Sequence, residues 1–166
     1  IEYMEKAVAV DPEFASAYHA MSWAYGNQGY RSEEKKFLKK AMDLSDRLSD
    51  REKYNIQGAY YFNLSEKTYD KAIEAYEKLL ALYPDDLGGN NHLGILYSRI
   101  NEWDKAIESY ENCIKYGGKD IVFYINLAGQ YRIKVLFDKA RQVLEEYLNN
   151  VSDNALKHLS AMKKLE

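Results

Sequence analysis

The stretch DKAIEAYE, residues 70–77, recurs as DKAIESYE at residues 104–111, 34 residues further along the chain. A shorter copy, DKA, begins at Asp138 after the same interval. A period of about 20 to 50 residues is typical of proteins built from supersecondary units, each of which buries its apolar face only by stacking on its neighbours. The sequence therefore predicts a repeat protein, whose architecture is easier to infer than its chemistry.

The overall composition disfavours several classes of partner. The 166 residues are 46% hydrophobic, and 23 basic against 26 acidic residues give a net charge of −3. A protein that binds the phosphate backbone carries a basic patch or stripe, so nucleic acid is not expected as a partner.

The single cysteine, Cys113, cannot form an internal disulfide, which fits a reducing compartment, and the expected location is the cytoplasm.

The apolar runs are short. One of the longest, residues 121–125, is far below the roughly 20 residues that span a bilayer, so membrane insertion is not expected. The chain opens on Ile1 with helical periodicity and without a charged-then-apolar leader, and we expect it to be a piece of a longer protein.

Each repeat combines two helical patterns. The first pattern carries a small residue three positions before a tyrosine, and the second carries an alanine after Asp-Lys. Two antiparallel helices approach closely only where a side chain is nearly absent, so these small residues predict the contact within each helix pair. The small residues of the first pattern are Ser22, Gly58, Gly94 and Ala128, the tyrosines are Tyr25, Tyr61, Tyr97 and Tyr131, and the alanines are Ala72, Ala106 and Ala140.

This pattern resembles the tetratricopeptide repeat, a helix-turn-helix unit of about 34 residues, over nearly the whole chain. The resemblance implies an all-α fold, a right-handed superhelical solenoid of antiparallel helix pairs. More narrowly, residues 48–54 and the later Tyr-Pro-Asp-Asp at residues 83–86 resemble arrays appended to bacterial signalling enzymes and transcription regulators. In this frame the units are a half-repeat at 1–11, full repeats at 15–48, 51–86, 87–120 and 121–154, and a half-repeat or capping helix at 155–166.

Two departures from the family pattern are visible. Glu34 stands where the family has the packing alanine. The interval from Tyr61 to Tyr69 is two residues longer than that from Tyr97 to Trp103, which predicts a wider turn near residues 64–67.

No set of residues points to catalysis. The three histidines, His19, His92 and His158, fall in different units without a cysteine or carboxylate at metal-ligand spacing, so neither a metal nor another cofactor is expected. Cys113 occupies a small packing position, which predicts a buried thiol, not a nucleophile. The sequence therefore favours a non-enzymatic protein.

The resemblance also implies a binding surface, because the first helix of each unit lines the concave wall of such a solenoid. In the resulting groove, Asn55, Asn91 and Asn126 can hydrogen-bond the backbone of an extended peptide. Apolar side chains of the peptide would meet Trp23, Phe62 and Ile95, and a carboxylate would meet Arg99 or Arg132. The implied groove residues are His19, Trp23, Asn27, Asn55, Phe62, Asn91, His92, Ile95, Arg99, Asn126 and Arg132.

The main hypothesis is therefore a scaffold that binds a peptide segment or helix of a partner protein. The asparagines can equally be solvated helix residues, and the array can be a regulatory or sensor domain of a larger signalling enzyme or transcription regulator. No lysine falls at the groove positions of the family's chaperone-binding variant, so its carboxylate clamp is absent. Self-association through the terminal helices is a further alternative, with apolar residues exposed there at Ile1, Met4, Val8, Leu159 and Met162.

Overall fold

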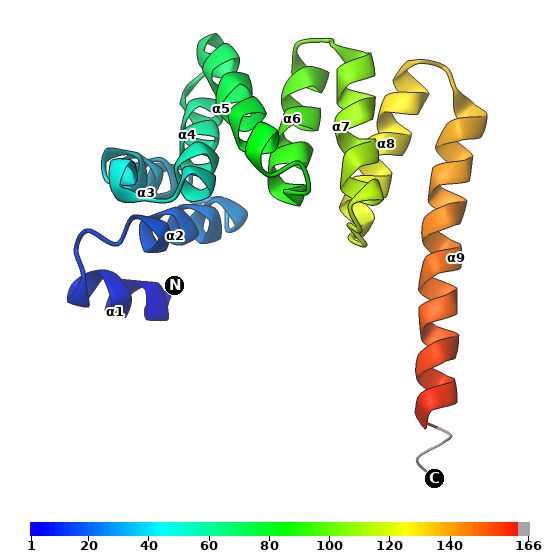
Figure 1. The fold of residues 1–166 in the computed structure, drawn as a ribbon, viewed down its shortest axis with the longest axis horizontal. Helices are drawn as coiled ribbons and strands as arrows, with labels where there is room; N and C mark the ends of the chain where they lie inside the picture. Colours follow the sequence, from blue (N-terminus) through cyan, green and yellow to red (C-terminus); the bar gives the residue numbers. More distant parts are fainter. Residues whose placement is uncertain (163–166) are drawn as a thin grey trace.

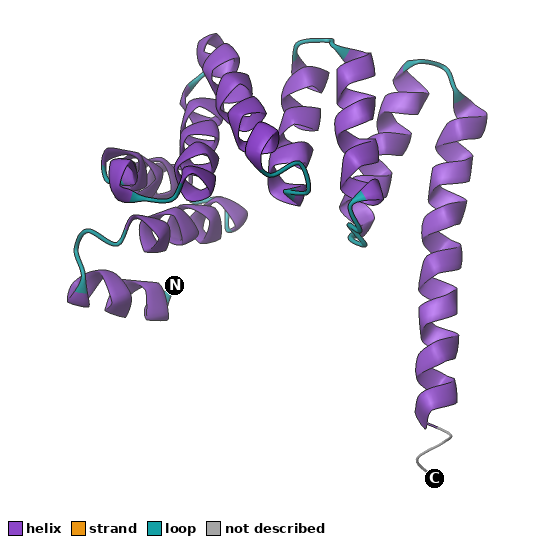
Figure 2. Ribbon diagram, in the orientation of Figure 1, coloured by secondary structure: helices purple, strands orange, loops and turns teal. Residues whose placement is uncertain are grey.

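The computed structural model describes residues 1–162, with side-chain positions as far as Val151. Over this range the chain is helical with short turns and has no strand (Figure 2). The helices follow one another as antiparallel pairs that form an arch (Figure 1), so the all-α solenoid predicted from the repeat is confirmed. In chain order the helices are α1 Glu2–Val10, α2 Ala15–Asn27, α3 Arg31–Asp43, α4 Asp50–Leu64, α5 Tyr69–Leu82, α6 Leu87–Arg99, α7 Trp103–Lys115, α8 Ile121–Ile133 and α9 Phe137–Met162.

In two of the helix pairs, a tyrosine ring lies over a glycine of the neighbouring helix. The ring of Tyr76 on α5 covers Gly58 on α4, and the ring of Tyr110 on α7 covers Gly94 on α6. A Cβ atom at either glycine would lie 2.5 Å from a ring carbon, closer than van der Waals contact permits. The close contact within these two pairs therefore depends on a residue without a side chain, as the repeated small positions predicted.

A repeated tyrosine-glutamate bond connects successive pairs. The Tyr97 hydroxyl donates to the Glu77 carboxylate at 2.7 Å, and the Tyr131 hydroxyl donates to Glu111 at 2.5 Å, 34 residues later. Burial, together with the Glu111 carboxylate, raises the pKa of Tyr131 to about 12. Glu77 and Glu111 stand five residues after the packing alanines Ala72 and Ala106. Five residues after Glu34, at the joint between α3 and α4, stands Lys39, so this joint lacks the bond.

Two turns of 3-10 helix interrupt the regular alternation. Residues Glu66–Thr68 form one of them, at the place where the extra residues predicted a wider turn. Residues Ser45–Arg47 form the other, between α3 and α4.

The end of the array differs from the predicted division. A separate helix was expected from Ala155, but α9 runs from Phe137 to Met162 as one helix. This segment holds neither glycine nor proline, so nothing in it stops the helix at residue 154. The side chains of His158, Leu159 and Met162 lie outside the described residues.

Candidate functional site

A hollow of about 560 Å³ lies between the first helices of three successive units, α2, α4 and α6. Its size falls within the range of protein sites that enclose a small ligand or a few side chains. We refer to this space as the hollow. The residues from the predicted groove that line it are His19, Trp23, Asn27, Asn55, Phe62 and His92.

Helical spacing explains why these side chains share one surface. On α4, Ala59 stands four residues after Asn55, and Phe62 and Asn63 stand three and four residues after Ala59, so these side chains project from one side of the helix. Trp23 on α2 is 69% exposed, an unusual state for so large an apolar side chain. An exposed tryptophan beside a hollow is typical of a binding surface.

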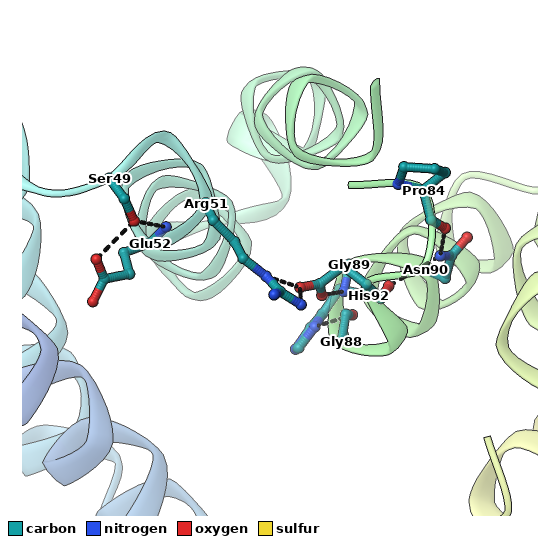
Figure 3. Close-up of polar contacts among 9 residues, drawn as sticks. Ser49, Arg51, Glu52, Pro84, Gly88, Gly89, Asn90 and His92 are labelled. Atoms are coloured by element: carbon teal, nitrogen blue, oxygen red, sulfur yellow. Dashed lines mark hydrogen bonds and ion pairs between the residues drawn. The ribbon is translucent and has the colours of Figure 1, made fainter. Parts of the chain in front are cut away.

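His92 is held by three contacts. Its Nδ1 atom lies 2.8 Å from the carbonyl oxygen of Gly88, one helical turn earlier (Figure 3). Its ring stacks on Tyr76, with centroids 5.1 Å apart and planes at 6°, and meets the edge of Phe62 at 6.0 Å. These contacts fix the direction of the imidazole ring at the edge of the hollow.

Burial determines the charge of both histidines in the hollow. Desolvation lowers the pKa of His92, although Gly88 and Asp86 act in the opposite direction. Desolvation also lowers the pKa of His19, and the charge of His92 lowers it further. Both imidazoles are therefore neutral near neutral pH, and protonation of one opposes protonation of the other.

Arg99 is placed at the neighbouring surface by aromatic rings. Its guanidinium lies 4.8 Å from the centroid of Phe62 and 5.7 Å from that of Tyr69, and it donates to the Tyr69 hydroxyl. Phe62 and Tyr69 also stack on each other at 5.9 Å. Arg99 is thus oriented by cation-π contacts, and its remaining N–H groups stay available to an acceptor.

The remaining predicted groove residues lie outside the hollow. The Asn126 amide donates to the Asn91 side-chain oxygen at 3.2 Å, so these two asparagines bond to each other, whereas Asn55 lines the hollow. Ile95 is half-buried against the core, and Arg132 is exposed. The structure therefore brings the first part of the predicted groove together around the hollow, and the second part adjoins it where Arg99 packs on Phe62.

The hollow also includes residues that the sequence did not single out as groove residues. Glu34 and Arg31 line it and form an ion pair at 2.7 Å. The only sign in the sequence was that Glu34 stands in place of the packing alanine. The other additional lining residues are Ser16, Ala20, Ser22, Leu38 and Gly88, whereas Ala59 and Asn63, which also line the hollow, are at groove-facing positions of the repeat frame.

A polar joint fixes α6 against α4 beside the hollow (Figure 3). Asp86 caps α6 by accepting from the Gly89 backbone N–H at 2.8 Å, and it pairs with Arg51 of α4 at 2.8 Å. The Asn90 amide donates to the carbonyl oxygens of Pro84 and Asp86, both at 3.0 Å. Because α6 carries His92, this joint positions one side of the hollow.

Replacing Asp86 with alanine is expected to lower the free energy of unfolding by about 2 kcal/mol, since the change removes both a helix cap and a buried acceptor. Urea unfolding followed by circular dichroism measures this effect. Asp120→Ala is the matched control, because Asp120 caps α8 through the Val122 N–H at an exposed position. Equal losses of unfolding free energy in the two variants would show that the ion pair between Asp86 and Arg51 adds nothing to stability.

Acidification is expected to destabilise the chain through His19 and His92. Their folded-state pKa values lie below the ordinary value of 6.5, so between these values the unfolded chain binds more protons. The free energy of unfolding therefore rises with pH in this window. The stability that the two neutral histidines contribute is lost as the pH falls through it. Urea titrations at about pH 7.5 and about pH 5.5 test this, and the double variant His19→Gln with His92→Gln should show a smaller difference. If the double variant shows the same difference in stability between the two pH values as the wild type, the two histidines are not the cause of the pH dependence.

Within the described part of the chain, no group of three histidine, cysteine, aspartate or glutamate side chains is placed to hold a metal ion. Among the same residues, no helix is both long and apolar enough to cross a membrane. Cys113 is buried, and burial raises the pKa of its thiol to about 12, so it is a packing residue.

Comparison with known proteins agrees with the repeat inferred from the sequence. Sequence models of the tetratricopeptide repeat match residues 15–47, 57–86 and 91–121. Human tetratricopeptide repeat protein 21B is 25% identical over 159 residues, covering 96% of the chain but 12% of that protein. The chain thus spans about an eighth of the length of this relative.

Solved structures show the same arrangement of helices. The crystal structure of MamA matches with a TM-score of 0.63 and 28% identity, covering 92% of this chain and 86% of MamA. The structure of YrrB, described as a tetratricopeptide repeat protein with an unusual peptide-binding site, matches with a TM-score of 0.59 at 18% identity, covering 98% of this chain and 81% of YrrB. At that identity, the likeness to YrrB shows the fold alone.

Proposed function

The chain belongs to the tetratricopeptide repeat family, and we propose that it is a non-catalytic module that binds a segment or helix of a partner protein at the hollow. The observation that carries this proposal is the exposed Trp23 beside a hollow whose polar residues include Asn55 and His92. A large aromatic side chain surrounded by amide and imidazole groups supplies both the apolar contact and the hydrogen bonds that protein recognition needs.

The second part of the predicted groove extends the same surface. Arg99 is oriented by Phe62, which also lines the hollow, and offers donors to a carboxylate of the partner. Asn91 and Asn126 bond to each other and keep further donor and acceptor capacity for a peptide backbone. We therefore place the apolar contact of the partner at the hollow and any acidic residue of the partner near Arg99 or Arg132.

Selection from a displayed library of random dodecapeptides tests the proposal. Peptides selected on the wild-type chain should bind it in fluorescence anisotropy, and Trp23→Ala together with Asn55→Ala should weaken binding at least about tenfold. Tyr3→Ala is the matched control, because Tyr3 is an exposed aromatic residue on α1, outside the hollow. The proposal fails if no peptide is selected, or if the selected peptides bind the double variant as well as the wild type.

Asn91→Ala with Asn126→Ala tests the second part of the groove separately. A loss of affinity in this variant would extend the binding surface to α8. Unchanged affinity would restrict that surface to the hollow.

Self-association is a second candidate, favoured by exposed apolar residues on α9. Leu144 is 40% and Leu148 is 61% exposed, whereas Tyr110 and Ile114, which stand 34 residues earlier, are buried and half-buried. A further helix packed there would cover this surface. Light scattering across a concentration series decides the point, because a constant monomeric mass at high concentration would exclude it. A regulatory role in a longer protein, a bacterial origin and a cytoplasmic location stay predictions.

A further inference from the structure

His92 presents a fixed hydrogen-bond acceptor to its surroundings. A neutral imidazole carries one proton, and the Gly88 carbonyl oxygen 2.8 Å from Nδ1 can only accept, so the proton resides on Nδ1. The Nε2 atom is then an acceptor. Stacking on Tyr76 and the T-shaped contact with Phe62 hold the plane of the ring, and turning the ring over would break the hydrogen bond from Nδ1 to Gly88.

The charges around the hollow balance. Glu34 pairs with Arg31, and both line the hollow, so together they add no net charge. The titratable neighbours of His92 are His19, which lines the same hollow, Tyr76 beneath its ring, and Asp86 at the N-cap of its own helix. Asp86 is already paired with Arg51. A charged ligand group would therefore lose its hydration without gaining an unpaired counter-ion in the hollow.

The position of the acceptor also distinguishes two forms of a peptide ligand. In a helix, most backbone N–H groups are bonded within the helix and cannot reach an external acceptor. In an extended segment, the backbone N–H groups are free to donate. An acceptor at Nε2 of His92, close to apolar surface at Phe62, therefore favours an extended segment.

We propose that the hollow binds an extended, uncharged segment of a partner protein, one apolar or aromatic side chain of which packs against Trp23 and Phe62 while a neighbouring backbone N–H donates to Nε2 of His92. This inference rests on the proposed function and specifies its ligand. It has one chemical consequence: protonation of His92 converts Nε2 into a donor, so binding weakens as the pH falls. An acidic ligand would behave in the opposite way, because it would bind with uptake of a proton.

An N-methyl scan of a selected dodecapeptide tests the hydrogen bond. Methylation of one backbone nitrogen at a time removes one N–H donor, and a single position next to the apolar anchor should lose about tenfold in affinity for the wild type. The variant His92→Phe keeps an aromatic ring over Tyr76. It should bind the unmethylated peptide about tenfold more weakly than the wild type does, and methylation at the sensitive position should not weaken its binding further. His19→Gln is the control, and it should retain the sensitivity to methylation.

The pH dependence supplies an independent measurement. Affinity of the wild type should fall about tenfold between about pH 7.5 and about pH 5.5, and His92→Phe should bind equally at both values. Circular dichroism at both pH values confirms that each variant is folded. If His92→Phe does not fold, the methylation scan and the pH series on the wild type decide the proposal by themselves.

The outcomes separate this inference from the function on which it rests. Absence of any selected peptide, or binding that is independent of Trp23 and Asn55, overturns the proposed function. Three results would overturn the inference alone, for peptides whose binding needs Trp23. The peptides would tolerate methylation at every position, bind more tightly at the lower pH, or carry a conserved acidic residue at the anchor.

Discussion

Replacing Gly94 with valine is expected to lower the free energy of unfolding by about 3 kcal/mol, because the new side chain would overlap the ring of Tyr110. A Cβ atom at this position lies 2.5 Å from one ring carbon of Tyr110 and 2.8 Å from another. Tyr110 is buried, so its ring cannot turn aside into solvent. Urea unfolding monitored by circular dichroism measures the loss.

Gly129→Ala is the matched control on the next first helix. Nothing lies within 4 Å of a Cβ atom at Gly129, so alanine should stabilise α8 by up to about 1 kcal/mol through its better helix propensity. The double variant Gly94→Val with Tyr110→Leu should recover part of the loss, because leucine vacates the ring position. Similar effects of Gly94→Val and Gly129→Ala would contradict the close contact within the pair.

Replacing Tyr76 with alanine is expected to lower the free energy of unfolding by about 4 kcal/mol. Tyr76 is fully buried, covers Gly58 and stacks on His92, so its removal leaves a cavity between α4, α5 and α6. Peptide affinity should fall as well, since His92 would lose the ring that supports it. Urea unfolding and anisotropy with the same variant measure the two effects.

Tyr76→Phe separates the ring from the hydroxyl. Among the described residues the Tyr76 hydroxyl has no hydrogen-bond partner, so its removal should leave stability unchanged or raise it by up to about 1 kcal/mol. Tyr97→Phe is the comparison, because it removes the bond to Glu77 and should cost about 1 kcal/mol. If Tyr76→Phe is the more damaging of the two, the buried hydroxyl has a role that the packing of its ring does not explain.

These predictions depend on contacts whose positions follow from the repeat. Gly58 and Gly94 are recognisable in the sequence because each stands three residues before a tyrosine, and Tyr76 and Tyr110 occupy the same place in the echoed phrase. Periodic positions of this kind report on neighbours within one unit or the next, because a solenoid has contacts only over that range. The family and the helix pairs could therefore be inferred without coordinates.

The extent of the site could not be inferred in the same way. The family frame gives Asn55 and Asn91 the same place in successive units, yet Asn91 accepts a hydrogen bond from Asn126 whereas Asn55 lines the hollow. Equivalent positions in successive units have different surroundings when the joints between units differ. At the joint between α3 and α4, Lys39 stands where the later joints have Glu77 and Glu111.

The sequence by itself determined the repeat, its frame and the buried close contacts, because these depend on local spacing and on the size of single side chains. Only the tertiary structure decided that His19 and His92, from units that are not adjacent, line the same hollow, and that Arg51 reaches Asp86. The physical reason is that the relative angle of successive helix pairs depends on many small contacts at each joint. No periodic pattern in the sequence encodes that angle.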